Sequence, residues 1–354
     1  MKKKFIAELT AFQARYEAQK IAFGPVVFQC VRIAWKKGLL NSLAQGAMSS
    51  DQLIEKHQIS VYALHTLLES CLSAGVVAME DNCWRLEKIG YMLVNDKLTQ
   101  VNFNYINDVC WQGLFELEQS LDAEEPLGLA HLGPWKTIYE GLSDLPEPAK
   151  TSWFEFDHFY SDSAFPDALA KVFAAAPQRL MDVGANTGKW ALQCLRYNSD
   201  VELTLVDLPI QLNVAQKNLE QAGFLGRVSL APRDLLAADL AFPKGHDAIW
   251  MSQFLSCFSL AEIGKILERA ANALSAGGKL FILDTFWDRQ QYDIAAFCLI
   301  NTSPYFTCMA SGNSKIYRAT EYIACAEQAG FALTQSWDGL GLSHTLLQFQ
   351  KNGT

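Results

Sequence analysis

The chain has 354 residues, of which 50% are hydrophobic and 19% are charged, and its formal net charge is −9. This length and composition predict a globular protein with two domains and a large core, and they exclude a disordered chain. The negative charge disfavours a nucleic-acid partner, and no apolar run reaches the ~18 residues that predict a membrane-spanning helix.

The first residues and the cysteines predict a cytoplasmic protein. Three lysines at the start precede Phe5 and Ile6, but Glu8, Arg15 and Glu17 interrupt any apolar core, so we expect no signal peptide. The nine cysteines contain no C-x-x-C pair, which favours packed, reduced thiols. No histidine or cysteine cluster has the spacing of metal ligands, so we expect no metal site.

Residues 1–100 are predicted to form a winged-helix-like domain. The expected elements are an apolar helix over 26–39, a short helix capped by Ser49 or Ser50, a helix over 64–72 that ends at Gly75, and a hairpin over 76–86. Such a fold can bind DNA, but residues 57–84 contain no lysine or arginine for phosphate or base contacts. The apolar residues favour a protein–protein surface instead.

Residues 101–175 separate this domain from the rest of the chain and are rich in aromatic side chains. Glycine and proline interrupt the region at Gly133–Pro134 and Pro146–Pro148. Aromatic faces suit both a cationic ligand and a flat organic substrate, although the same rings also suit a domain core.

A glycine turn at residues 184–188 is the most informative motif. Apolar residues 180–183 predict a strand, Gly184 and Gly188 predict a tight turn, and a helix is expected to begin near Lys189. A second apolar strand over 203–207 ends in Asp207, which is placed to accept hydrogen bonds from ribose hydroxyls. Together these features predict a nucleoside cofactor bound to a doubly wound α/β sheet.

The elements after this turn continue the alternation of strands and helices. We expect a strand over 227–230, a buried strand over 246–253, an amphipathic helix over 260–274 ended by the glycines of Ser275–Gly278, and a strand over 279–284. This order predicts a parallel sheet with right-handed crossovers. Residues 176–354 are therefore expected to form the catalytic domain.

The spacing D-V-G-x-x-x-G from Asp182 to Gly188 differs from the dinucleotide fingerprint and resembles motif I of the S-adenosylmethionine-dependent methyltransferases. With the winged-helix-like domain, the chain resembles the small-molecule O-methyltransferases of the plant caffeate type and their bacterial relatives. The resemblance implies S-adenosylmethionine as cofactor, a homodimer formed through the first domain, and a helical linker that covers the substrate pocket. The cofactor-binding residues that it implies are Asp182, Gly184, Gly188, Asp207, Leu208, Asp234, Leu235, Ser252 and Gln253.

The same resemblance implies an aromatic or phenolic small-molecule substrate. The residues expected to line its pocket are Tyr160, Phe286, Trp287, Phe297, Tyr305, Phe306, Met309 and Asn313. Asn313 is also suited to a turn beside Gly312.

The proton-transfer residues depart from the family pattern. Where the family has the catalytic histidine of K-x-x-x-H-D-W, this chain has Ser256, followed by Cys257 and Phe258. The family's orienting acid corresponds to Asp284, and a second acid is absent near Ala319.

Three explanations stay open for the missing histidine. Another base, His158 or His344, takes the proton; or the acceptor is an already acidic phenol; or an electron-rich ring is methylated on carbon. We therefore expect a methyltransferase acting on an aromatic small molecule, on oxygen by family and on carbon as an alternative. The rivals are a cofactor-binding protein without turnover and a winged-helix transcription factor.

Overall fold

A computed structural model of the chain describes all residues except 1–4, 6–7, 236, 238–240 and 353–354. The chain divides into two compact units, residues 1–108 and 109–354. None of the helices in the described part is long and apolar enough to cross a membrane.

The first unit combines helices with a small antiparallel sheet in the order β1-β3-β2. Its buried apolar side chains, among them Leu39, Leu64 and Trp84, form one core. Its elements are α1 (Ala11–Lys36), α2 (Leu39–Leu43), β1 (Met48–Ser49), α3 (Ser50–His57), α4 (Val61–Ser73), β2 (Val77–Glu80), β3 (Cys83–Leu86), α5 (Lys88–Asn95) and α6 (Lys97–Tyr105).

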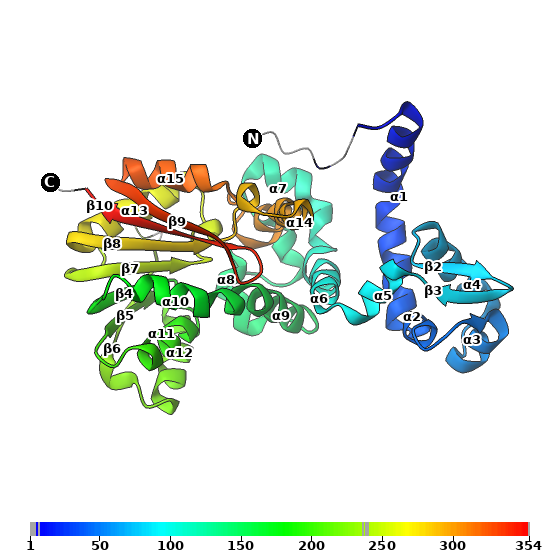
Figure 1. Cartoon of the computed structure of the whole chain (residues 1–354), viewed down its shortest axis with the longest axis horizontal. Coiled ribbons are helices and arrows are strands. Elements are labelled where there is room, and N and C mark those ends of the chain that lie inside the picture. The colour runs from blue at the N-terminus through cyan, green and yellow to red at the C-terminus, as the bar shows by residue number, and fades with distance from the viewer. Residues whose placement is uncertain (1–4, 6–7, 236, 238–240, 353–354) are drawn as a thin grey trace. The chain divides into compact units, whose positions relative to one another are not determined.

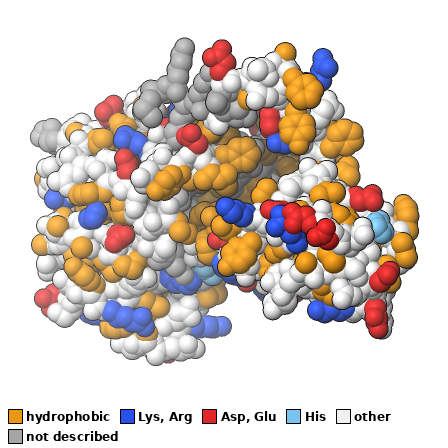
Figure 2. Space-filling view, turned by 45° about the vertical axis from the view of Figure 1, so that its right-hand side comes forward, with side chains coloured by type: hydrophobic (Ala, Val, Ile, Leu, Met, Phe, Trp, Pro, Cys, Tyr) orange, Lys and Arg blue, Asp and Glu red, His pale blue; other side chains and the backbone are white. Residues whose placement is uncertain are grey.

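The caps of these helices follow the expected chemistry, with one correction. Ser49 is the cap of α3, because its hydroxyl accepts the amide N–H of Gln52. The helix expected from residue 26 begins earlier, at Ala11, because Thr10 and Gln13 form a capping box there. Apolar side chains of α1 are exposed, including Phe12 at 80% and Ile21 at 81%. Figure 2 shows hydrophobic side chains exposed among charged ones on the face that it draws.

The second unit begins with short helical segments and continues as a doubly wound sheet with strand order β6-β5-β4-β7-β8-β10-β9. The pairs β5–β6, β4–β5, β4–β7 and β7–β8 are parallel, whereas β10 is antiparallel to both of its neighbours. The predicted α/β class is confirmed. The strands are β4 (Arg179–Val183), β5 (Glu202–Asp207), β6 (Val228–Pro232), β7 (His246–Ser252), β8 (Leu274–Asp284), β9 (Phe331–Leu340) and β10 (His344–Lys351).

Helices cover both faces of this sheet (Figure 1). Side chains of α13 (Leu260–Ala273) and α15 (Ala319–Gln328) fill the core on one face. Side chains of α10 (Phe165–Phe173), α11 (Lys189–Tyr197) and α12 (Pro209–Gln221) fill the core on the other. The remaining helical segments are η1 (Ile106–Cys110), η2 (Gly113–Glu116), α7 (Leu117–Ala123), η3 (Leu127–His131), α8 (Ile138–Gly141), η4 (Leu142–Asp144), α9 (Ala149–Ser161), η5 (Asp162–Ala164), η6 (Leu225–Arg227), η7 (Leu255–Cys257), η8 (Trp287–Arg289), α14 (Asp293–Tyr305) and η9 (Phe306–Ala310).

The expected glycine cap after α13 is wrong. The helix ends at Ala273, and β8 begins at once with Leu274, so Ser275–Gly278 belongs to the strand. The register between β7 and β8 shifts at this point, which accommodates Gly277 with its positive φ of 74°.

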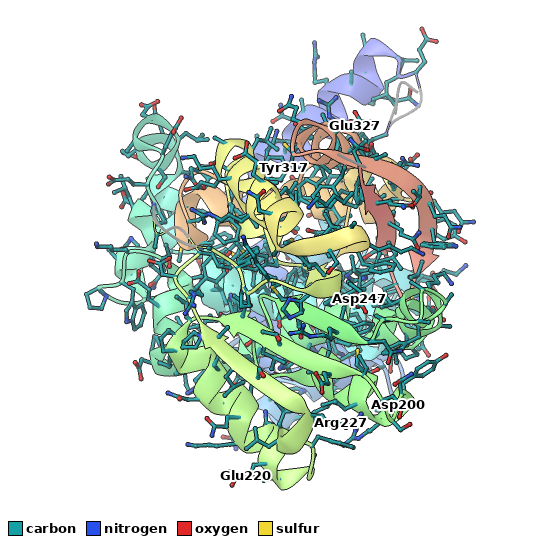
Figure 3. The ribbon with its side chains drawn as sticks, turned by 90° about the vertical axis from the view of Figure 1, so that its left-hand side faces the viewer. Asp200, Glu220, Arg227, Asp247, Tyr317 and Glu327 are labelled. Atoms are coloured by element: carbon teal, nitrogen blue, oxygen red, sulfur yellow. The ribbon has the colours of Figure 1, made fainter. Side chains whose placement is uncertain are left out.

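Charged side chains tie down the edge of the sheet where the parallel strands begin (Figure 3). The guanidinium of Arg227 donates to the carbonyls of Leu195 and Asn198, and the carboxylate of Asp247 accepts the amides of Gln178 and Arg179. These contacts stabilise loops at the amino edge. The opposite, carboxyl edge carries the glycine turn.

Candidate functional site

The turn after β4 has the backbone that its glycines predict. Gly184 and Gly188 have positive φ values of 79° and 78°. A Cβ atom on Gly184 would lie 2.4 Å from the ring of Phe254, whereas one on Gly188 would lie 3.2 Å from Ala215. Gly184 is therefore required by both backbone conformation and packing, and Lys189 begins α11 as expected.

Backbone amides fix the carboxylate of Asp207 at the end of β5. The amide of Asn186 in the turn donates to Oδ2 at 2.7 Å, and the amide of Leu208 donates to Oδ1 at 2.7 Å. Burial raises the pKa of Asp207, and these two hydrogen bonds oppose that increase. Each oxygen has lone pairs beyond those bonds, so the carboxylate is a candidate acceptor for the hydroxyls of a nucleoside sugar.

Asp182 lies beneath the same turn and is 2% exposed. Its Oδ2 atom is buried and has no hydrogen-bond partner within the described part of the chain. Burial, followed by the charge of Asp207, raises the pKa of Asp182 to about 8. Asp182 is thus largely protonated at neutral pH. In this uncharged form it does not add a second negative charge next to Asp207.

The remaining cofactor candidates follow β5, β6 and β7 at this carboxyl edge. Leu208 caps α12, Asp234 is exposed, and Leu235 is buried at 6% exposure. Ser252 ends β7, and Gln253 beside it has a positive φ of 47°. The Nε2 atom of Gln253 is buried without a partner among the residues described, which makes it a candidate donor to a ligand.

Ser256 and Asp284 come together where β7 and β8 end. Burial raises the pKa of Asp284 to about 7, while hydrogen bonds from the amide of Thr285, the hydroxyl of Tyr322 and the amide of Ser256 oppose the increase. The Tyr322 hydroxyl lies 3.1 Å from Oδ2 of Asp284. A carboxyl group that titrates near neutrality is suited to accepting a proton.

The two candidate histidines occupy different environments. Nδ1 of His158, on α9, lies 2.9 Å from the ammonium of Lys189 and 3.7 Å from the carboxylate of Asp157. His158 is therefore beside the glycine turn, with Nδ1 positioned to accept from Lys189. His344 begins β10 and is fully buried, neither ring nitrogen has a partner in the described structure, and burial lowers its pKa to about 4. His344 therefore stays neutral and is a weak base.

Comparisons with known proteins agree with this geometry. Residues 15–84 match the Dimerisation2-like domain, and residues 165–332 match the O-methyltransferase domain. The L-tyrosine C(3)-methyltransferase of Streptomyces lavendulae is 21% identical and covers 88% of this chain and 85% of its own. The 3-hydroxy-5-methyl-1-naphthoate 3-O-methyltransferase of Streptomyces sahachiroi is 25% identical over 73% of this chain and 74% of its own. The apo structure of the methyltransferase SibL has a TM-score of 0.70 at 22% identity and covers 94% of this chain and 98% of its own.

The chain belongs to the S-adenosylmethionine-dependent O-methyltransferase family. It is a methyltransferase, and its cofactor is S-adenosylmethionine. The glycine turn and Asp207 have the chemistry that this cofactor requires: a tight approach for the backbone and acceptors for the ribose hydroxyls. The roles of individual residues stay predictions.

The predicted substrate residues are spread over several environments. Phe286 is fully buried and packs edge-on against Tyr322, and Tyr305 accepts a hydrogen bond from Trp153 at 2.7 Å. Met309 is buried with its sulfur against the backbone of Gly113. The others range from half-buried, for Tyr160, Trp287 and Phe306, to exposed, for Phe297 and Asn313.

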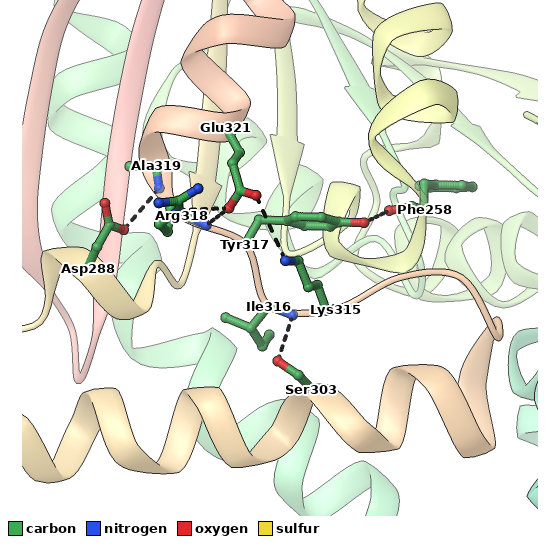
Figure 4. A network of polar contacts seen from close by, with 9 residues as sticks. All are labelled: Phe258, Asp288, Ser303, Lys315, Ile316, Tyr317, Arg318, Ala319 and Glu321. Atoms are coloured by element: carbon green, nitrogen blue, oxygen red, sulfur yellow. Dashed lines mark hydrogen bonds and ion pairs between the residues drawn. The ribbon is translucent and has the colours of Figure 1, made fainter. Parts of the chain in front are cut away.

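Asn313 and the segment after it make contacts with protein groups. The side-chain amide of Asn313 donates to the carboxylate of Glu262 at 3.4 Å, at the start of α13. At the place of the missing second acid, the amide of Ala319 donates to the carboxylate of Asp288 at 3.0 Å (Figure 4). Tyr317 donates to the carbonyl of Phe258 at 2.9 Å in the same network.

Tyr139 on α8 belongs to the aromatic-rich region 101–175 that was expected to cover the substrate pocket, but it was not singled out as a site residue. Its hydroxyl lies beside the thiol of Cys257, with Tyr305 and Asp157 as electrostatic neighbours. Neither its spacing nor a motif distinguishes it in the sequence. Only the fold brings α8 to the end of β7.

Proposed function

We propose that this methyltransferase transfers a methyl group from S-adenosylmethionine to an aromatic, phenolic small molecule, with oxygen as the favoured acceptor. The observation that carries the proposal is the carboxyl edge itself. The glycine turn and Asp207, which is held by backbone amides, lie at this edge together with Tyr322 and Asp284, whose pKa is raised to about 7 by burial. Relatives that act on tyrosine and on a hydroxynaphthoate support a phenolic acceptor.

In this proposal the turn at 184–188 holds the cofactor and Asp207 accepts the ribose hydroxyls. Leu235 covers one face of the adenine, and Asp234 accepts from its amino group. Ser252 and Gln253, at the end of β7, complete the cofactor side. The cofactor supplies an activated methyl group, so the task of the protein is to hold donor and acceptor in line.

Methyl transfer releases a proton from the acceptor, and we propose that Asp284 takes it. The acceptor oxygen forms a bond to the methyl carbon, the carbon–sulfur bond breaks, and its electron pair stays on sulfur. The carboxylate of Asp284 accepts a hydrogen bond from the backbone amide of Ser256. Ser256 occupies the place of the family's histidine. The hydroxyl of Ser256 is not itself a base at neutral pH. His158 is the alternative base, although its Nδ1 faces the ammonium of Lys189.

Carbon methylation is the second candidate. A relative that methylates tyrosine on carbon favours it, as does the serine in place of the family's histidine. In that reaction the ring carbon takes the methyl group first and loses its proton afterwards, so a base is needed only after transfer.

Incubation with isotopically labelled S-adenosylmethionine and a panel of phenols that includes L-tyrosine and 1-naphthol tests the activity. We expect label in the product, and fragmentation by mass spectrometry then distinguishes oxygen from carbon. The rival is a protein that binds the cofactor without turnover. Calorimetric binding of S-adenosylhomocysteine with no transfer to any phenol would favour that rival, and absence of both would remove the proposal.

We also propose a homodimer formed through the first unit, in a reducing compartment such as the cytoplasm. The Dimerisation2-like match and the exposed apolar side chains of α1, including Phe12, Ile21 and Phe23, support the dimer. The nine free cysteines support the compartment. Light scattering of the purified chain at two protein concentrations tests the dimer, and a monomer mass at both would contradict it.

A further inference from the structure

The hydroxyl of Tyr139 differs from the other tyrosine hydroxyls near the ends of β7 and β8. Tyr322 donates to Asp284, Tyr317 donates to the carbonyl of Phe258, and Tyr305 accepts from Trp153. The Tyr139 oxygen is buried, and its polar neighbour in the described structure is the Cys257 thiol, a weak partner whose contact does not have the geometry of a full hydrogen bond. Buried tyrosine hydroxyls normally find a partner, so an orphaned one indicates a missing ligand group.

The surroundings of this hydroxyl come from separate elements of the same unit. The thiol of Cys257, in η7, lies directly beside it, Tyr305 belongs to α14, and Asp157 belongs to α9. Cys257 follows Ser256, whose backbone amide donates a hydrogen bond to the carboxylate of Asp284. Tyr139 is therefore next to the segment that replaces the family's proton-transfer residues.

The position of Tyr139 is well fixed by packing. Its neighbour Ile138 is fully buried. A Cβ atom on Gly141, at the end of α8, would lie 2.1 Å from the ring of Trp135, so glycine lets the indole pack against this turn. A hydroxyl on such a rigid segment is preorganised for a ligand and loses little side-chain entropy on binding.

We propose that Tyr139 is an acceptor-binding residue: its hydroxyl donates a hydrogen bond to the phenolic oxygen of the substrate and holds that oxygen near Cys257 and Asp284. This inference rests on the proposed function and adds to it the group that recognises the acceptor. Burial keeps the pKa of Tyr139 well above its usual range, so the residue retains its proton and acts as a donor. A donor to the phenol oxygen stabilises the negative charge that develops when Asp284 takes the proton.

Cys257 is suited to a place beside the acceptor because it stays uncharged. Burial raises the pKa of its thiol to about 12. A neutral thiol is a weak hydrogen-bonding group and does not compete with a phenol for the tyrosine hydroxyl. The aspartate that the family has at this place would compete, because a carboxylate is a strong acceptor.

The test uses the full chain saturated with S-adenosylhomocysteine and titrated with 4-nitrophenol, whose absorbance reports both binding and ionisation. We expect Tyr139→Phe to weaken 4-nitrophenol binding about tenfold, the usual effect of one lost hydrogen bond to a partly charged oxygen. Affinity for S-adenosylhomocysteine should not change. The melting temperature of Tyr139→Phe should fall little, because the neighbour that the hydroxyl would lose, the Cys257 thiol, is a weak hydrogen-bonding group.

Tyr317→Phe is the matched control, because Tyr317 is also buried and its hydroxyl donates to a protein carbonyl. We expect this variant to lose stability and to keep its 4-nitrophenol affinity. Equal 4-nitrophenol affinity in Tyr139→Phe and wild type would overturn the inference, and so would absence of binding by the wild-type complex. If wild-type protein fails to bind S-adenosylhomocysteine in the first place, the proposed function fails instead.

Discussion

The cofactor-binding half and the proton-transfer half of the carboxyl edge differ in the kind of contact that positions their residues. At the turn after β4, the backbone does the work: Gly184 and Gly188 have positive φ, and amides of the turn and of Leu208 fix Asp207. At the ends of β7 and β8, backbone amides also hold Asp284, but a side chain from a distant part of the chain, Tyr322, completes its hydrogen bonds. A backbone-built site tolerates few substitutions, whereas a side-chain-built site can change its chemistry within one fold.

The largest effect should come from breaking the backbone-built half with Gly184→Ala. The new Cβ atom would lie 2.4 Å from the Phe254 ring at a φ of 79°, so strain and overpacking combine. We expect a loss of about 2–4 kcal/mol in the free energy of unfolding and loss of measurable cofactor binding. Denaturant unfolding and calorimetry with S-adenosylhomocysteine measure these effects. Gly226→Ala is the control, because its Cβ would meet nothing within 4 Å; an equal loss there would contradict the explanation.

The second prediction tests the side-chain-built half through Asp284→Asn. If Asp284 is the base, kcat should fall about 100-fold while cofactor affinity is kept. The carboxylate is the active form, so the wild-type rate should rise with pH up to about 7 and then level off, whereas the variant should lack this step. Asp288→Asn, which removes a charge but keeps an oxygen that can accept from the Ala319 amide, serves as the control. An unchanged pH profile in Asp284→Asn would assign the proton to another group.

The same burial of Asp284 affects stability with a defined sign. Its pKa is raised from 3.8 to about 7, so the folded state holds this proton more tightly than the unfolded chain does. Its contribution to stability is therefore present at low pH and decreases as pH rises from about 4 to 7. Asp284→Asn should remove that decrease from the pH dependence of the melting temperature.

The third prediction concerns the carboxylate that the turn holds. Asp207→Asn replaces one acceptor oxygen by an NH₂ group that faces a backbone amide donor, either that of Asn186 or that of Leu208. Cofactor affinity should fall about 10- to 100-fold, as expected when hydrogen bonds to a charged group are lost. Calorimetry with S-adenosylhomocysteine gives the ratio. The control Asp200→Asn lies at the amino edge of the sheet and should leave affinity unchanged.

The two halves were also unequally predictable from the sequence. The order of strand, glycine turn, helix and acid is local, so the strands to Val183 and to Asp207 and the start of α11 at Lys189 are correct. Contacts between distant segments have no local signal, so Tyr139 and Tyr322 were missed. Ser275–Gly278 was assigned to a helix cap because glycines favour both caps and bulges, and only strand pairing decides between them.

The smallest effect is expected at His344, which lies at the same edge and whose ring nitrogens have no hydrogen-bond partner among the described residues. His344→Leu removes two ring nitrogens that are buried without hydrogen bonds, so the free energy of unfolding should change by less than about 1 kcal/mol, or rise. The rate of methyl transfer and its pH profile should also be unchanged, because a histidine with its pKa lowered to about 4 by burial is a weak base. His246→Leu is the comparison variant, because both ring nitrogens of His246 have partners. Nε2 lies 2.9 Å from the hydroxyl of Thr204, and Nδ1 lies 3.0 Å from the carbonyl of Pro243. Removing that ring leaves the Thr204 hydroxyl and the Pro243 carbonyl unpaired and should lower the free energy of unfolding by about 1–3 kcal/mol. A fall in rate for His344→Leu without a fall in stability would instead place this imidazole in the reaction.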